Sequence, residues 1–219
     1  MQAANNTTLE TFKNWTLRVR QPARTPARLL LMLHGWTGDE NSMWVFGRDL
    51  PPHYLILAPR APHAAESFGY SWRPPQDGTH GRPSLETLRP SADSLIRLVD
   101  DYSASIGMDA AQFDVMGFSQ GAAMTNLLTM LYPQRIHKAG VLAGFVPGGL
   151  DELVAMRPLE AKPFFVTHGT LDELVPIERA RESIAVLEEA GAQVTYCESE
   201  VGHKVSADCM RALKSFLQD

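Results

Sequence analysis

The chain has 219 residues, of which 44% are hydrophobic and 21% are charged. This composition fits a globular protein and excludes a disordered or collagen-like chain. The formal net charge of -5 argues against a nucleic-acid-binding surface, which is usually basic. We therefore expect residues 1–219 to form a single folded domain that binds no nucleic acid.

The two cysteines, Cys197 and Cys209, are too few for a disulfide framework and form no C-x-x-C motif. We predict two free thiols, as is usual in a reducing cytosol. The N-terminal segment lacks the charged and apolar regions of a signal peptide, and no apolar stretch is long enough to cross a bilayer. The sequence therefore predicts a cytoplasmic protein without stable membrane insertion, and it leaves open whether that protein is a monomer or a homodimer.

Short apolar runs alternate with helical patterns along the chain, after an expected antiparallel edge strand at Trp15–Val19. The runs predict buried strands at Ala27–Leu33, Tyr54–Ala58, Phe113–Gly117, Ala139–Ala143, Pro163–Thr167 and Gln193–Cys197. The helical patterns lie at Ser91–Ile106, Gln120–Leu131, Ile177–Ala190 and Val205–Leu217. Such alternation predicts a mostly parallel central sheet flanked by helices. Residues 59–90, rich in Pro and Gly, read as a long irregular loop at the functional end of the sheet.

The sequence G-F-S-Q-G at 117–121 has the G-x-S-x-G pattern of a nucleophile elbow. It stands between a predicted strand and a predicted helix, where such an elbow must lie. The turn is sharp, and glycine at 117 and 121 tolerates the close approach because it has no Cβ. Ser119 is therefore the candidate nucleophile, exposed above the sheet at a helix N-terminus that favours negative charge.

A serine nucleophile needs a base and an acid, which follow it in chain order in enzymes with this elbow. His203 lies in a loop after the last predicted strand, and it is the one histidine downstream of Asp172. Asp172 follows the strand Pro163–Thr167 at the same sheet edge as the elbow. The adjacent Glu173 is its rival on position alone, and the weaker rivals are Glu198 and Glu200.

An oxyanion hole needs two backbone N–H donors. One is expected from Gln120, which follows the nucleophile. The second is expected from Trp36, in the loop LHGWTGDE that follows the first buried strand. We read His34, in the same loop, as a structural residue without a chemical step.

Four segments together resemble the phospholipase/carboxylesterase family of small α/β-hydrolases. They are LHGWTGDE (33–40), GFSQGAAM (117–124), HGTLDELVP (168–176) and GHKVS (202–206). The family includes bacterial carboxylesterases, acyl-protein thioesterases and lysophospholipases. The resemblance implies an α/β-hydrolase fold, places the acid on Asp172 and the oxyanion donors on Trp36 and Gln120, and requires no metal or cofactor. Many members carry leucine where Trp36 stands, and that difference affects the expected substrate.

The resemblance also implies positions that contact substrate. These are Trp36, Phe68, Trp72, Phe145 and Leu174, of which Phe68 and Trp72 belong to an aromatic segment beside the site. Trp44 reads instead as helix core. Residues 145–162 are too few to hold a large cap domain, so we expect an open site.

The expected activity is that of a serine carboxylesterase acting on a small-molecule ester, with short- to medium-chain acyl groups. An acyl-protein thioesterase or lysophospholipase uses the same chemistry and is the first alternative. A hydrolase fold used for binding alone is the second alternative, and it is disfavoured because serine, acid and histidine are all present.

Overall fold

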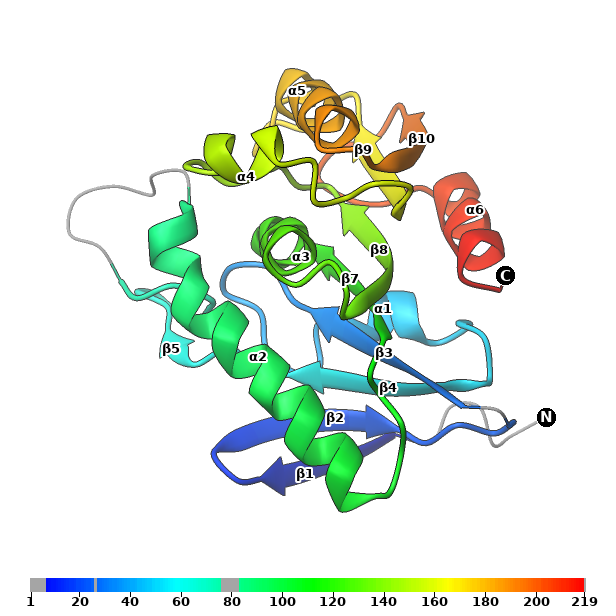
Figure 1. The fold of residues 1–219 in the computed structure, drawn as a ribbon. Coiled ribbons are helices and arrows are strands. Elements are labelled where there is room, and N and C mark those ends of the chain that lie inside the picture. Colours follow the sequence, from blue (N-terminus) through cyan, green and yellow to red (C-terminus); the bar gives the residue numbers. More distant parts are fainter. Residues whose placement is uncertain (1–6, 26, 76–82, 219) are drawn as a thin grey trace.

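The computed structural model describes residues 7–25, 27–75 and 83–218 (Figure 1). An eight-stranded sheet with the order β1-β2-β4-β3-β7-β8-β9-β10 forms its centre. The strands are β1 (Thr7–Phe12), β2 (Trp15–Arg20), β3 (Arg28–Leu33), β4 (Tyr54–Pro59), β7 (Phe113–Phe118), β8 (Ile136–Leu142), β9 (Pro163–Gly169) and β10 (Gln193–Ser199). All neighbouring pairs from β4 to β10 are parallel, whereas β2 is antiparallel to both β1 and β4.

Helices cover both faces of this sheet (Figure 1). They are α1 (Trp44–Gly47), α2 (Leu85–Ser105), α3 (Gln120–Leu131), α4 (Asp151–Ala155), α5 (Ile177–Glu189) and α6 (Ala207–Gln218). A separate two-stranded ribbon consists of β5 (His63–Ala64) and β6 (Tyr70–Ser71). The mostly parallel sheet flanked by helices, with only the short α4 between β8 and β9, confirms the predicted fold class without a large cap.

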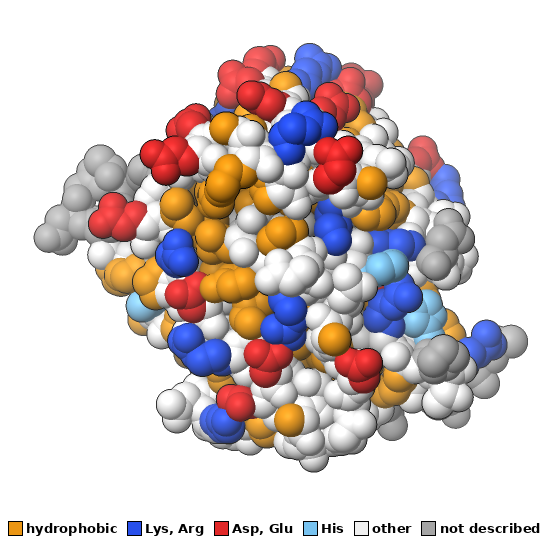
Figure 2. All heavy atoms as spheres, viewed as in Figure 1, with side chains coloured by type: hydrophobic (Ala, Val, Ile, Leu, Met, Phe, Trp, Pro, Cys, Tyr) orange, Lys and Arg blue, Asp and Glu red, His pale blue; other side chains and the backbone are white. Residues whose placement is uncertain are grey.

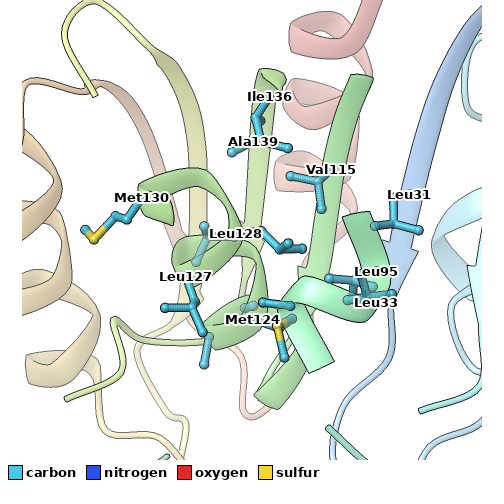
Figure 3. Close-up of a cluster of buried hydrophobic side chains, with 14 of the residues drawn as sticks. Leu31, Leu33, Leu95, Val115, Met124, Leu127, Leu128, Met130, Ile136 and Ala139 are labelled. Carbon is cyan, nitrogen blue, oxygen red and sulfur yellow. The ribbon is translucent and has the colours of Figure 1, made fainter. Parts of the chain in front are cut away.

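The two faces of the sheet hold separate hydrophobic clusters. On β3, Leu29, Leu31 and Leu33 face the cluster that contains side chains of α2, α3 and α5. Leu30 and Met32 face the opposite cluster, against α6 and the segment around α1. Figure 3 shows Leu31 and Leu33 beside Leu95 of α2 and side chains of α3. Burial on both faces explains why the central strands are almost continuously apolar.

Two sequence predictions about element positions were wrong. The expected edge strand at Trp15–Val19 lies inside the sheet, because β1 pairs along its outer side. The helix expected from Ser91 begins earlier, at Leu85, since a capping box of Ser84 and Thr87 starts it and Pro90 is accommodated within it. The loop expected over residues 59–90 is thereby shortened, and it contains the β5–β6 ribbon.

The prediction of two free thiols was also wrong, because Cys197 and Cys209 form a disulfide. Cys197 lies in β10 and Cys209 in the first turn of α6, and their Cα atoms are 5.7 Å apart. The two cysteines are twelve residues apart in the sequence, and the packing of α6 beside β10 brings them together. The cytoplasmic location can no longer be argued from free thiols, and it stays a prediction.

Acidic and basic side chains are interspersed over the face that carries α2, α3 and α5, around a group of hydrophobic side chains (Figure 2). Within the described ranges, no helix is long and apolar enough to cross a membrane.

Arg20, at the end of β2, is a buried cation in this fold, with a side chain only 2% exposed. Its guanidinium donates hydrogen bonds to the carbonyl oxygens of Gly47 (3.1 Å), Leu50 (3.3 Å) and Pro51 (2.8 Å). Burial lowers the pKa of Arg20. The three carbonyl groups end α1 and lead into β4, so Arg20 fixes this connection to β2.

We expect Arg20→Leu to lower the free energy of unfolding by about 3 kcal/mol, because it removes three hydrogen bonds from a charged donor and leaves the carbonyl oxygen of Leu50 without a donor among the described residues. Urea denaturation followed by circular dichroism measures this loss. Arg24→Leu, at an exposed position of the following loop, is the matched control and should change stability by less than about 0.5 kcal/mol. Equal effects of the two substitutions would contradict the role of Arg20.

Candidate active site

Ser119 lies between the end of β7 and the start of α3, in a backbone conformation that non-glycine residues rarely adopt. Its φ is 55° and its ψ is -114°. Holding a serine in this conformation costs roughly 1–3 kcal/mol and is typical of functional sites. The turn leaves the side chain partly exposed while both flanking elements are buried.

The glycines around Ser119 make this turn sterically possible. A Cβ on Gly117 would lie 2.1 Å from the carbonyl oxygen of Gly121, and one on Gly121 would lie 2.0 Å from the carbonyl oxygen of Leu33. A Cβ on Gly144, after β8, would lie 2.3 Å from that of Ala122. The crowding expected from the G-x-S-x-G pattern is therefore present, and it extends to β3 and to the segment after β8.

The loop after β3 lies against Ser119. A Cβ built on Gly35 would be 3.3 Å from the Cβ of Ser119, so the backbone of this loop borders the serine. Trp36 follows, with a side chain 42% exposed. The N–H of Gln120, in the first turn of α3, has no acceptor among the described residues, as expected at a helix N-terminus.

The β5–β6 ribbon holds this loop from the other side. Thr37 donates its N–H to the carbonyl oxygen of Tyr70 at 3.0 Å, and Tyr70 donates to that of Gly38 at 2.9 Å. The side chain of Gln120 joins the same ribbon, because it accepts from the N–H of Trp72 and donates to Ser71. The ribbon therefore connects the two segments that carry the expected oxyanion donors.

His34 is a buried support of the same loop. Its Nε2 accepts from the N–H of Ala61 at 3.0 Å, so Nδ1 carries the proton and donates to the carbonyl oxygen of Gly35 at 2.7 Å. Burial is the main cause that lowers the pKa of His34, and the ring is therefore held neutral. These contacts agree with the structural role that the sequence suggested.

Asp172 and His203 form a close pair on adjacent loops after β9 and β10. His203 Nδ1 lies 2.6 Å from Asp172 Oδ2, and the other carboxylate oxygen accepts the N–H groups of Leu174 (3.0 Å) and Val175 (2.9 Å). The Asp172 side chain is fully buried, whereas the His203 side chain is 16% exposed. Three donors thus hold a buried carboxylate in one orientation.

The rivals of Asp172 lie elsewhere. Glu173 is exposed, and Glu198 pairs with Arg181 and Tyr196. Sequence reasoning missed a second histidine at this acid: His168 is fully buried, and its Nε2 lies 3.4 Å from Asp172 Oδ2 and 2.7 Å from the carbonyl oxygen of Val175. Its place in the HGTLDELVP segment was the available signal.

Phe118 brings the histidine to the elbow. The rings of Phe118 and His203 have centroids 4.9 Å apart, and Phe118 directly precedes Ser119. The loops that carry the pair are also in contact, since a Cβ on Gly169 would lie 2.2 Å from the carbonyl oxygen of Val201. Serine, histidine and aspartate, far apart in sequence, therefore gather at the carboxyl edge of β7, β9 and β10.

A cavity of about 560 Å³ opens beside this arrangement, between α1, the loop after β3 and the loop after β10. Its walls are mainly apolar, with one lysine. The side chains that line it include Trp36, Met43, Val45, Phe46, Phe118, Lys204 and Val205. Of these, only Trp36 was predicted from the sequence as a substrate contact.

The other predicted substrate contacts lie outside this cavity. The prediction that Trp72 contacts substrate was wrong, because its side chain is fully buried. Its indole N–H donates to the carbonyl oxygen of His34 at 2.8 Å, so Trp72 supports the loop after β3. Phe145 is mostly buried, with its ring centroid 4.2 Å from the guanidinium carbon of Arg179. Phe68 and Leu174 are exposed, and their contact with substrate stays a prediction.

Trp44 is half-buried in α1 and packs against the cluster between the sheet and α6. In the part of the chain that the structure describes, no group of three or more His, Cys, Asp or Glu side chains is placed to hold a metal ion.

Residues 14–219 match the family model described as Phospholipase/Carboxylesterase. The chain belongs to the phospholipase/carboxylesterase family. Both the family resemblance and the α/β-hydrolase fold inferred from the four sequence segments are thereby confirmed. Members of this family are serine hydrolases, which agrees with the elbow and the acid–histidine pair.

Individual relatives are distant. Carboxylesterase SOBER1 of Arabidopsis thaliana is 28% identical over 144 residues, which cover 63% of this chain and 61% of that protein, less than two thirds of its length. Acyl-protein thioesterase 1 of Kluyveromyces lactis is 25% identical over 181 residues, covering 74% of this chain and 77% of that protein. The crystal structure of the Bacillus cereus carboxylesterase has a TM-score of 0.81 at 20% identity and covers 94% of each chain, a likeness of fold.

The buried, neutral His34 gives a testable dependence of stability on pH. Because its pKa in the folded protein lies below the ordinary 6.5, the unfolded chain takes up a proton first as the pH falls. Stability is therefore lost as the pH drops below 6.5 toward the folded value. We expect the free energy of unfolding, measured in urea at pH about 7.5 and about 5.5, to fall more in wild type than in His34→Gln.

His53 and His63, whose pKa values are also lowered by burial, remain in both proteins, so the comparison removes only His34. An equal fall in the two proteins would show that His34 does not carry this dependence.

Proposed function

We propose that this protein is a serine carboxylesterase, with Ser119 as nucleophile, His203 as base and Asp172 as the acid that orients it. The observation that carries the proposal is the contact of 2.6 Å between His203 and the buried Asp172, with the His203 ring packed against Phe118, which directly precedes Ser119 in the strained elbow. Family membership supports the same reaction class.

In the first half of the reaction, Ser119 Oγ attacks the ester carbonyl carbon while His203 Nε2 takes the hydroxyl proton. Asp172 stays ionised and stabilises the imidazolium through the bond to Nδ1. The N–H groups of Gln120 and Trp36 stabilise the developing oxyanion, each by roughly 2.7–4 kcal/mol. The tetrahedral intermediate then collapses as His203 protonates the leaving alcohol, and an acyl-enzyme on Ser119 remains.

In the second half, a water molecule enters where the alcohol left. His203 takes a proton from this water as it attacks the acyl carbon, and then returns the proton to Ser119 Oγ. The carboxylic acid product leaves and the free enzyme is restored. Each step uses only the three side chains and the two amides.

The cavity beside the elbow supports an ester with an apolar part as substrate. Its walls of Trp36, Phe46 and Phe118 suit an aliphatic or aromatic group through burial of apolar surface. Only the short α4 lies between β8 and β9, so no cap covers the site. A bulky remainder of the ester can therefore stay in solvent while its apolar group occupies the cavity. We propose small carboxylic esters with short- to medium-chain acyl groups, ahead of long-chain lipids or acylated proteins.

The decisive experiment measures hydrolysis of p-nitrophenyl esters of graded acyl length by wild type and Ser119→Ala. We expect turnover by wild type, highest for short or medium chains, and a fall of about 10⁶-fold in kcat for the variant. Circular dichroism establishes that the variant is folded. Turnover that survives the substitution would reject the nucleophile, and an optimum at long chains would favour a lysophospholipase or thioesterase.

A second pair of variants tests the acid. Asp172→Asn should lower kcat by about 10⁴-fold with little change in KM, because the amide favours the wrong histidine tautomer. Glu173→Gln, the neighbouring exposed position, is the matched control and should retain wild-type kinetics. If Glu173→Gln were the more damaging substitution, the assignment of the acid would be wrong.

A further inference from the structure

The Cys197–Cys209 disulfide spans the loop that carries His203. Cys197 precedes this histidine by six residues and Cys209 follows it by six, so His203 stands at the middle of the covalent ring. One end of the ring is the edge strand β10, and the other is the first turn of the C-terminal helix α6. The disulfide therefore joins the two ends of the loop that carries His203, the proposed general base.

A small polar cluster lies at the same base. The hydroxyl oxygens of Ser199 and Ser206 are 2.8 Å apart, and Ser199 Oγ lies 3.4 Å from Cys209 Sγ. Ser206 Oγ also accepts the N–H of Cys209 at 3.2 Å. These contacts connect the two ends of the loop, but each is a single weak or neutral hydrogen bond that water can replace.

Farther along, α6 is anchored by apolar contacts at a distance from the loop. Leu213 and Leu217 are buried in the cluster between the sheet and α6, one and two turns beyond Cys209. The end of α6 that adjoins the loop is held by the fully buried Cys209 and by the partly buried Val205 and Met210. Reduction therefore removes the covalent part of the anchor at the loop-proximal end, whereas Leu213 and Leu217 continue to hold the far end.

We propose that the Cys197–Cys209 disulfide is a positioning element that holds His203 in register with Asp172, and that its reduction lowers catalysis while the fold persists. The proposal rests on the proposed function of His203. β10 pairs with β9 so that Ser199 stands opposite Gly169, and both loops leave the sheet at this point. A shift of the start of α6 moves His203 relative to the buried Asp172, which is fixed by two backbone N–H groups.

A dithiol is the class of reductant that this step requires. One thiolate of the reductant attacks one sulfur of the disulfide, which forms a mixed disulfide and releases the other cysteine as a thiol. The second thiol of the reductant then attacks the reductant's own sulfur in the mixed disulfide, so the first cysteine is released and the reductant leaves as a cyclic disulfide. The protein gains two electrons and two protons as two thiols. Attack is expected at Cys197, which is partly exposed, rather than at the fully buried Cys209.

The test compares the oxidised protein, the protein reduced with dithiothreitol, and the double variant Cys197→Ser/Cys209→Ser, all kept well below their unfolding temperatures. We expect kcat for a p-nitrophenyl ester to fall roughly tenfold to a hundredfold, with KM unchanged, as for a misplaced catalytic group. Reoxidation of the reduced wild type should restore kcat. Circular dichroism records that each form is folded.

Leu217→Ala is the matched control, since it loosens α6 at its far end and leaves the disulfide intact. It should lower the unfolding temperature and keep wild-type kcat. An equal loss of kcat in Leu217→Ala would assign the effect to helix packing and overturn the role of the disulfide. Reduced, folded protein with unchanged kcat would overturn it as well.

A readout without turnover separates this proposal from the proposed function. In protein labelled with ¹⁵N-histidine, the Nδ1 proton of His203, bonded to Asp172, should give an NMR signal in the oxidised form, assigned by its absence in His203→Gln. We expect reduction to remove or broaden this signal, whereas a signal unchanged on reduction contradicts the proposal. If the oxidised protein shows the signal but hydrolyses no ester, the proposed function fails and the positioning role is judged by the signal alone.

Discussion

The tight turn at Ser119 is the constraint on which the rest of the site depends. It forces the backbone of β7, α3 and the end of β3 into contact distances that no Cβ permits, as Gly117 and Gly121 show. The positive φ of Ser119 is maintained because buried elements surround it on both sides. Since backbone strain persists only where the surroundings determine it fully, the packed sheet and α3 are what make the serine available.

The proposed partners of Ser119 lie on loops at the carboxyl edge of the parallel sheet. Asp172 and His203 follow neighbouring strands, and their loops touch at Gly169 and Val201. A buried carboxylate is costly unless its oxygens are satisfied, and here three N–H donors satisfy them. The same donors fix the direction of the carboxylate, so electrostatic stability and geometric order have one cause.

Three supports outside the serine, histidine and aspartate hold the loops of the site. The β5–β6 ribbon holds the loop of Trp36 through Tyr70, and the neutral ring of His34 joins that loop to Ala61. On the opposite side, the disulfide closes the loop of His203. All three supports act on irregular segments that lie outside the central sheet. Precision at the site therefore comes from connections between loops as much as from the sheet.

The sequence by itself determined the fold class, the elbow at 117–121 and the candidates Asp172 and His203, because each depends on local patterns: apolar runs, glycine spacing and chain order. It could not determine the β1–β2 pairing or the disulfide, since these depend on contacts between separate elements. It also missed the start of α2, which depends on the side-chain hydrogen bonds of the capping box at Ser84 and Thr87. Only the tertiary structure decided that Trp72 is buried beneath His34 while Phe46, Phe118 and Val205 line the cavity. An aromatic residue reads alike in sequence whether it packs inside or faces a substrate, and the surrounding elements alone settle which it does.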